Sequence, residues 1–243
     1  MRLRTVLVIQ NTPFGSAGRF GEWLRQEGMD IEVAGPHHVP VPEHLGHRAL
    51  LVLGGKWLPD DDEQAPWLPA VRNLVGQALE GGNPMLGICL GGQLLAHVAG
   101  GRVDACHGTP EFGATPIQLR PEARSDPLFR ALPETTYAIE RHQDAITKLP
   151  PEAVWIAQSA DCAHQAFRIG RRAWGVQFHP EASAAKILDW PQGPLAAHGL
   201  DPQALHARAL AVEDASAADW HAFARAFADI AKEHGEADQR ASA

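Results

Sequence analysis

Short apolar runs alternate with longer amphipathic segments through the first hundred residues of the chain. The short runs are rich in Val, Leu and Ile and predict strands; they cover residues 3–9, 31–34, 49–53 and 84–88. Two longer segments, 19–27 and 67–80, place apolar residues at helical spacing. This alternation is typical of parallel strands joined by crossover helices, because each helix covers an apolar face of the sheet. The pattern predicts an α/β fold.

After Gly101 the texture changes to strand-like pieces with little helical periodicity. They are separated by turns and cover residues 115–119, 136–140, 154–158, 165–169 and 173–178. These predict antiparallel additions to a mostly parallel sheet, with a hairpin turn at 169–172 that delivers His179 to a strand end. Near the C-terminus, apolar residues spaced for one helix face predict a terminal helix; they are Trp220, Phe223, Phe227 and Ile230. We expect residues 1–243 to form a single domain, with a helical extension from about 187 to 234 and a frayed tail from 235.

Composition excludes several classes of protein. A formal net charge of −8 without a Lys/Arg block argues against nucleic acid as a partner. The most apolar stretch, 85–101, contains Gln93 and His97, and it is shorter than the roughly 20 apolar residues that a membrane span needs. Three widely spaced cysteines without a C-x-x-C pattern predict neither a disulfide framework nor a zinc knuckle, and favour a reducing, cytoplasmic setting. The histidines are scattered, and the one adjacent pair, His37-His38, lacks a matching ligand spacing, so no metal or other cofactor is expected.

The strongest chemical signal is Gly87-Ile88-Cys89-Leu90-Gly91, which lies between an apolar strand and a helical segment. This is the layout of a G-x-nucleophile-x-G elbow. Glycines two positions before and after the nucleophile let the strand and the helix approach each other, and the start of the helix favours a thiolate. Cys89 is therefore the predicted nucleophile. The alternative is a buried structural cysteine, a common fate of free cysteine.

A histidine and a carboxylate that suit this nucleophile follow about ninety residues later. The apolar strand 173–178 delivers His179 to its end, Pro180 stops the strand, and Glu181 can turn back to accept the imidazole Nδ1 proton. A cysteine nucleophile is usually paired with a histidine that a third group orients. Cys89, His179 and Glu181 are the predicted triad.

Residues 86–96 and 175–181 together resemble the class I (triad) glutamine amidotransferases, particularly stand-alone proteins similar to the amidotransferase domain of guanosine monophosphate synthetase. The resemblance covers roughly residues 3–185. Weaker matches support it; they are 52–55, 66–68, 111–113 and 165–168. The resemblance implies a three-layer α/β/α, flavodoxin-like fold.

The resemblance also implies roles for individual residues. Cys89 would attack the side-chain amide of glutamine, His179 would pass a proton to the leaving ammonia, and water would resolve the thioester. The backbone N–H groups of Gly55 and Leu90 would form the oxyanion hole. The family's substrate contacts correspond to Gly54, Gln93, Arg141 and His142.

Some positions leave alternatives open. Gln93 either holds the substrate or is a polar residue in the first turn of a helix. Relatives read roughly S-H-G-D where this chain has 141–144; His142 matches, but Arg141 and Gln143 depart. Arg141 either favours a second carboxylate on the substrate or is a solvated side chain.

The loop after Gly55 also departs from the family pattern. Relatives continue G-G-P, whereas this chain has Lys56-Trp57, so the oxyanion loop either sits differently or is positioned by a partner protein. The acidic run 60–63 is either a solvated loop or a docking surface. Three tryptophans belong either to the core or to an interface; they are Trp57, Trp67 and Trp190.

Three functions remain open. The chain lacks a G-x-x-x-x-G-K-[ST] motif, and nothing after residue 186 resembles an acceptor domain, so any amination must occur on another chain. The leading hypothesis is a glutaminase-type subunit that uses glutamine and works with a separate synthase subunit. The alternative is an independent γ-glutamyl peptidase acting on glutathione-like conjugates or γ-glutamyl amines. A third is a non-catalytic regulatory module on the same fold.

Overall fold

The computed structural model describes residues 2–241, with side chains from Arg4 to His234. Its main sheet has nine strands in the order β2-β1-β3-β4-β11-β10-β9-β6-β7. The first five in this order are parallel neighbours: β2 (Asp30–Ala34), β1 (Arg2–Ile9), β3 (His47–Val52), β4 (Met85–Ile88) and β11 (Ala173–Val176). The other four pair antiparallel: β10 (Ala166–Ile169), β9 (Val154–Gln158), β6 (Glu111–Leu119) and β7 (Thr135–His142). The α/β fold with antiparallel additions is confirmed.

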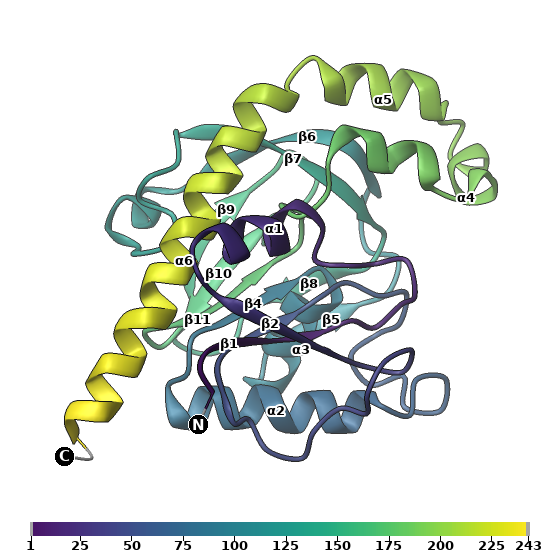
Figure 1. The fold of residues 1–243 in the computed structure, drawn as a ribbon. Helices are drawn as coiled ribbons and strands as arrows, with labels where there is room; N and C mark the ends of the chain where they lie inside the picture. Colours follow the sequence, from purple (N-terminus) through teal and green to yellow (C-terminus); the bar gives the residue numbers. More distant parts are fainter. Residues whose placement is uncertain (1, 242–243) are drawn as a thin grey trace.

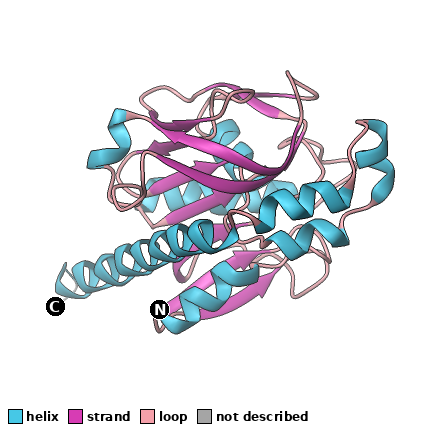
Figure 2. Cartoon of the chain, turned by 90° about the horizontal axis from the view of Figure 1, so that it is seen from above, coloured by secondary structure: helices cyan, strands magenta, loops and turns pink. Residues whose placement is uncertain are grey.

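Helices cover both faces of the parallel half, which gives three layers (Figures 1 and 2). α1 (Gly18–Gln26) and α6 (Glu213–Ala241) lie on one face, where Phe20 and Phe223 join the core with Val6 and Val8. α2 (Leu68–Gly81) and α3 (Leu90–Val98) lie on the other, with the core that contains Leu7 and Ile9. Successive residues of β1 therefore face opposite layers, as expected for a central strand.

The structure contains several short strands and helices that the sequence analysis did not predict one by one. β5 (Arg102–Asp104) and β8 (Ala145–Lys148) form a small antiparallel sheet. Between β6 and β7 lies the 3-10 helix η1 (Pro121–Ser125). After β11 come η2 (Ala184–Asp189), α4 (Gln192–Ala197) and α5 (Pro202–Leu210). Trp190, Leu195 and Leu205 from this segment pack on Ile139 of β7.

The terminal helix extends further than expected. The apolar spacing around Trp220 does lie on one helix, but α6 continues to Ala241 rather than ending near 234. Residues 242 and 243 of the expected frayed tail lie outside the described residues. Within the described part of the chain, no helix is long and apolar enough to cross a membrane.

Candidate active site

Cys89 occupies a strained turn between β4 and α3. Its backbone has φ 52° and ψ −111°, a conformation that a non-glycine residue rarely adopts and that typically costs about 1–3 kcal/mol. A Cβ on Gly87 would meet the carbonyl oxygen of Gly91, and a Cβ on Gly91 would meet that of Val52, so both positions must be glycine. The fold thus holds the sulfur at the N-terminus of α3, where the helix dipole favours a negative charge.

His179 and Glu181 lie beside Cys89. β11 ends at Val176, two residues before the expected Phe178, and the chain then continues until the His179 N–H donates to the Ile139 carbonyl at 2.8 Å. The His179 Nδ1 atom lies 2.7 Å from Glu181 Oε1, and the ring lies close enough to Cys89 for the two groups to interact electrostatically. The structure therefore brings the three predicted triad residues together.

The environment of His179 favours its protonated form. Burial alone would lower its pKa, but the charge of Glu181, the interaction with Cys89 and the hydrogen bond with Glu181 together raise the pKa well above its ordinary value. An imidazolium next to the sulfur stabilises a thiolate through Coulomb attraction. The pair can therefore act as a nucleophile and a proton donor.

Arg19 and Glu213 fix the His-Pro-Glu segment from outside. The Arg19 backbone N–H donates to the Glu181 carbonyl at 3.2 Å, and its Nε donates to the Pro180 carbonyl at 3.1 Å. Glu213, the first residue of α6, accepts from Arg19 Nη1 and from the Ala184 N–H, both at 2.6 Å. Sequence patterns did not reveal this pair, because 194 residues separate its members.

Gly54 and Gly55 follow β3; Gly54 lies against Cys89 and His179, and Gly55 lies against Leu90. A Cβ on Gly54 would lie 3.0 Å from His179 Cε1 and 3.4 Å from Cys89 Cβ, and a Cβ on Gly55 would lie 2.5 Å from the Leu90 side chain. Leu90 is in the first turn of α3, whose N–H groups have no intrahelical acceptor. Gly55 and Leu90 thus lie in neighbouring segments, and the assignment of their N–H groups to an oxyanion hole stays a prediction.

The loop after Gly55 is anchored within the chain. Trp57 is buried and meets Trp67 edge-on, with 4.9 Å between ring centroids. Trp67 Nε1 donates to Asn11 Oδ1 at 3.1 Å, and Asn11 Nδ2 donates to the Leu53 carbonyl at 2.8 Å. These contacts hold the end of β3, and they place Trp57 in the core.

The structure also places Asp62 of the acidic run and Trp190, two residues whose surroundings the sequence left open. Asp62 of the acidic run forms two 2.7 Å hydrogen bonds with Arg72 of α2, which lower the pKa of the Asp62 carboxyl. Trp190, which the sequence could assign to either the core or an interface, is also buried. Asp62 is thus tied to α2, and Trp190 belongs to the interior.

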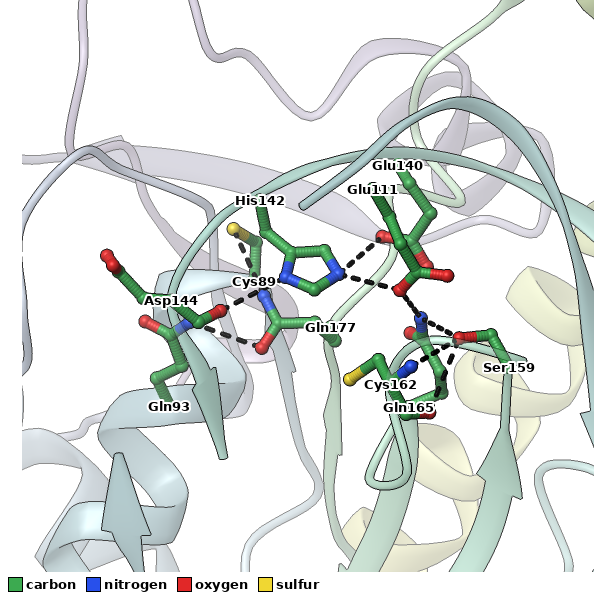
Figure 3. Close-up of polar contacts among 10 residues, drawn as sticks. All are labelled: Cys89, Gln93, Glu111, Glu140, His142, Asp144, Ser159, Cys162, Gln165 and Gln177. Atoms are coloured by element: carbon green, nitrogen blue, oxygen red, sulfur yellow. Dashed lines mark hydrogen bonds and ion pairs between the residues drawn. The ribbon is translucent and has the colours of Figure 1, made fainter. Parts of the chain in front are cut away.

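The Gln93 amide is engaged by protein groups. Its Nε2 donates to the Asp144 carbonyl and to Gln177 Oε1, both at 3.2 Å, and Gln177 Nε2 lies 3.7 Å from Cys89 Sγ (Figure 3). Gln93 is buried. Gln93 therefore connects the 142–144 loop to Gln177, which contacts the sulfur of Cys89.

Arg141 and His142 are consecutive residues of β7, and their side chains lie in different surroundings. The His142 ring is buried, with Nδ1 3.0 Å from the Asp144 carbonyl and Nε2 3.0 Å from Glu111 Oε2 (Figure 3). Arg141 is exposed, with its guanidinium 5.4 Å from the centroid of Trp190. Partial burial lowers the pKa of Arg141, and the charge of Cys89 raises it in part. Arg141 is therefore a second cation, besides His179, within electrostatic reach of the nucleophile.

A buried polar cluster behind His142 was not predicted. Glu140 is fully buried, and burial followed by the charge of Glu111 raises its pKa well above the ordinary value. The amide of Gln165 is near Glu140, but its Nε2 is directed to Glu111 Oε2 at 2.8 Å and to Ser159 Oγ at 3.2 Å. Burial also raises the pKa of Cys162 to about 12. A sequence signal was present only for Glu140 and Gln165, which are polar residues inside the predicted strands 136–140 and 165–169.

A cysteine elbow at the end of a parallel strand is a layout found in hydrolases, and comparison with known families gives the class of protein. The model of the family "Glutamine amidotransferase class-I" matches residues 23–187, more than half of the chain. The chain belongs to the class I glutamine amidotransferases. Membership of this family supports, at a general level, cysteine-dependent hydrolysis of the glutamine amide.

Several similar proteins are glutamine-hydrolyzing GMP synthases or their subunits. A glutamine-hydrolyzing GMP synthase subunit of Methanopyrus kandleri is 39% identical over 143 residues, which cover 58% of this chain and 71% of that protein. The subunit of the same name from Thermoplasma acidophilum is 35% identical over 165 residues, 66% of this chain and 76% of that protein. The glutamine-hydrolyzing GMP synthase of Porphyromonas gingivalis is 47% identical over 105 residues, but the match spans 42% of this chain and only 20% of that protein.

Solved structures agree on the fold. A glutamine amidotransferase from Thermotoga maritima superposes with a TM-score of 0.83 at 23% identity, covering 94% of this chain and 100% of that one. A glutamine amido transferase from Methylobacillus flagellatus gives 0.78 at 26% identity, covering 96% and 95%. The expected flavodoxin-like, three-layer fold is confirmed.

Proposed function

We propose that this chain hydrolyses γ-glutamyl amides through Cys89, with glutamine as the substrate and with the ammonia passed to a separate synthase subunit. The observation that carries the proposal is the imidazole of His179, which hydrogen-bonds to Glu181 and lies beside Cys89 at the N-terminus of α3. The relatives from Methanopyrus kandleri and Thermoplasma acidophilum are each named as one subunit of a GMP synthase, which supports a partner chain that supplies the acceptor site.

In the proposed reaction, the Cys89 thiolate attacks the γ-carbonyl carbon and the oxygen becomes negatively charged next to the N–H groups of Gly55 and Leu90. His179 then gives its proton to the amide nitrogen, the C–N bond breaks, and ammonia leaves a thioester on Cys89. Water attacks the thioester while the neutral His179 takes its proton. Glutamate is released and the starting ion pair is restored.

Arg141 favours a second candidate, an independent γ-glutamyl peptidase. The Arg141 guanidinium lies 5.4 Å from the ring centroid of Trp190 and within electrostatic range of Cys89. A glutathione-like substrate carries a carboxylate beyond the γ-amide, and an exposed guanidinium near Cys89 suits that group. The bond chemistry is unchanged, with an amine leaving in place of ammonia.

Turnover by the purified protein alone distinguishes the two candidates. Glutamate release is measured with glutamine and with a panel of γ-glutamyl peptides, and a glutamine-mimicking electrophile is used to label the protein. Faster turnover of peptides supports the peptidase; turnover of glutamine, or labelling of Cys89 with slow turnover, supports the amidotransferase. Cys89→Ala should lose both signals, whereas Cys106→Ala, a change at an exposed cysteine, should keep them. Absence of both turnover and labelling in the folded protein would refute the proposal.

A further inference from the structure

We propose that Glu111, His142, Cys162 and Glu140 form a binding site for one divalent ion of the zinc class, behind the Cys89 site and separate from it. Glu111 begins β6, His142 ends β7, and Cys162 lies in the loop between β9 and β10. Among the described residues, the ligand atoms of Glu111, His142 and Cys162, all buried, lie within 4.8 Å of one another. A mixed set of sulfur, imidazole nitrogen and carboxylate oxygen is the donor set that Zn²⁺ accepts.

The contacts of His142 gather acceptor atoms at the centre of the cluster. Its Nδ1 lies 3.0 Å from the Asp144 carbonyl oxygen, which can only accept, so Nδ1 carries the proton. In the neutral ring, Nε2 then presents a lone pair to Glu111 Oε2 at 3.0 Å and to Glu140 Oε2 at 3.6 Å (Figure 3). A lone pair and two carboxylates repel one another unless a cation or a shared proton lies among them.

The carboxylate of Glu140 is buried beside His142 and lacks hydrogen-bond partners among the described residues. Its side chain is 0% exposed, and neither carboxylate oxygen has a hydrogen-bond partner in the described part of the chain. A buried carboxylate normally has hydrogen-bond partners or coordinates a metal. Its Oε2 is directed at the same His142 nitrogen as Glu111, so an ion at that point would also satisfy Glu140.

The groups around the cluster match the outer layer of a metal site. Ligating histidines typically donate the other ring N–H to a backbone carbonyl or a carboxylate, and ligating carboxylates are themselves hydrogen-bonded. Here Nδ1 of His142 faces the Asp144 carbonyl, and Gln165 Nε2 donates to Glu111 Oε2 at 2.8 Å. The ligands are thus oriented in advance.

An ion at this position would tie three separate segments together. Binding would displace the thiol proton of Cys162 to solvent and form a metal–sulfur bond, without any change in oxidation state. The Asp144 carbonyl also accepts from Gln93, which contacts Gln177 beside Cys89. The ion would therefore fix the 142–144 loop against the wall of the active site.

The test uses the full chain with Cys89→Ser, so that the active-site thiol cannot bind metal. Protein produced in medium supplemented with Co²⁺ should contain about one cobalt per chain and show a thiolate-to-cobalt charge-transfer absorption. Adding Cys162→Ser should remove that absorption. The matched control, Cys106→Ser, changes an exposed cysteine outside the cluster and should leave the absorption and the metal content unchanged.

Glu140→Gln keeps the proposal testable if Cys162→Ser fails to fold. It preserves the shape of the side chain and removes its charge, so Zn²⁺ should be lost to a chelator at an at least ~10-fold lower chelator concentration. Folded protein without cobalt absorption would overturn the proposal. So would absorption and metal retention unchanged in both Cys162→Ser and Glu140→Gln; a proton shared among His142 and the carboxylates would then occupy the site. None of these readouts depends on glutamine hydrolysis.

Discussion

The imidazole of His179 is held between Glu181, at 2.7 Å from its Nδ1, and Cys89, although about ninety residues separate the histidine from the cysteine. Because Glu181 orients the ring without taking part in bond formation, we expect Glu181→Gln to lower kcat by about 10²–10⁴-fold. Cys89→Ala should lower it further. Steady-state kinetics on the preferred γ-glutamyl substrate measures both, and a Glu181→Gln variant less active than Cys89→Ala would contradict this order.

The pH profile should report the charge of His179. Its pKa is raised in the folded protein, so the ion pair with Glu181 contributes stability below the unfolded pKa and loses it as pH rises through the folded pKa. Removing the charge in Glu181→Gln lowers that folded pKa. The alkaline limb of kcat/KM should then move to lower pH. An unmoved alkaline limb would show that another group controls it.

Arg19 should act as a positioning residue through the carbonyl of Pro180. Arg19→Ala removes this bond and the pairing with Glu213, so Glu181 is held less firmly and kcat should fall by about 10-fold or more, with KM less affected. Arg25→Ala changes an exposed arginine on the same helix and should have no effect. Equal losses in the two variants, or a change confined to KM, would exclude the positioning role.

Gly54 should tolerate no side chain. The Cβ of Gly54→Ala would lie 3.0 Å from His179 Cε1 and 3.4 Å from Cys89 Cβ, tighter than normal packing, so the pair must shift. A displacement of this kind costs up to about 10²-fold in kcat. Gly46→Ala is the matched control, because nothing lies within 4 Å of the new atom. Circular dichroism checks that both variants fold; full activity in folded Gly54→Ala would disprove the predicted crowding.

Arg141 should control substrate choice if the peptidase candidate holds. Arg141→Gln should raise KM for γ-glutamyl peptides by about 10-fold, while KM for glutamine stays within about twofold, because only the peptide carries the additional carboxylate. Arg171→Gln, at an exposed hairpin turn between β10 and β11, is the control. Equal effects on both substrates would assign Arg141 to general binding and not to selectivity.

The sequence alone was sufficient for the features whose physical causes are local. Runs of apolar residues mark β1, β3 and β4 because buried parallel strands are apolar on both faces. The glycines around Cys89 are required by the close approach of one strand and one helix that adjoin in the chain, so five residues reveal the elbow. The short spacing from His179 to Glu181 reveals their pairing for the same reason.

Tertiary structure decided which distant groups meet. Arg19 and Glu213 join elements 194 residues apart, and no local pattern marks either residue. Gln93 resembled a substrate contact, but its amide partners are set by how closely the 142–144 loop and Gln177 approach α3. Cys162 became a neighbour of His142 only through the packing of β6, β7 and the β9–β10 loop. A polar side chain has many candidate partners along a chain, and only the folded arrangement selects among them.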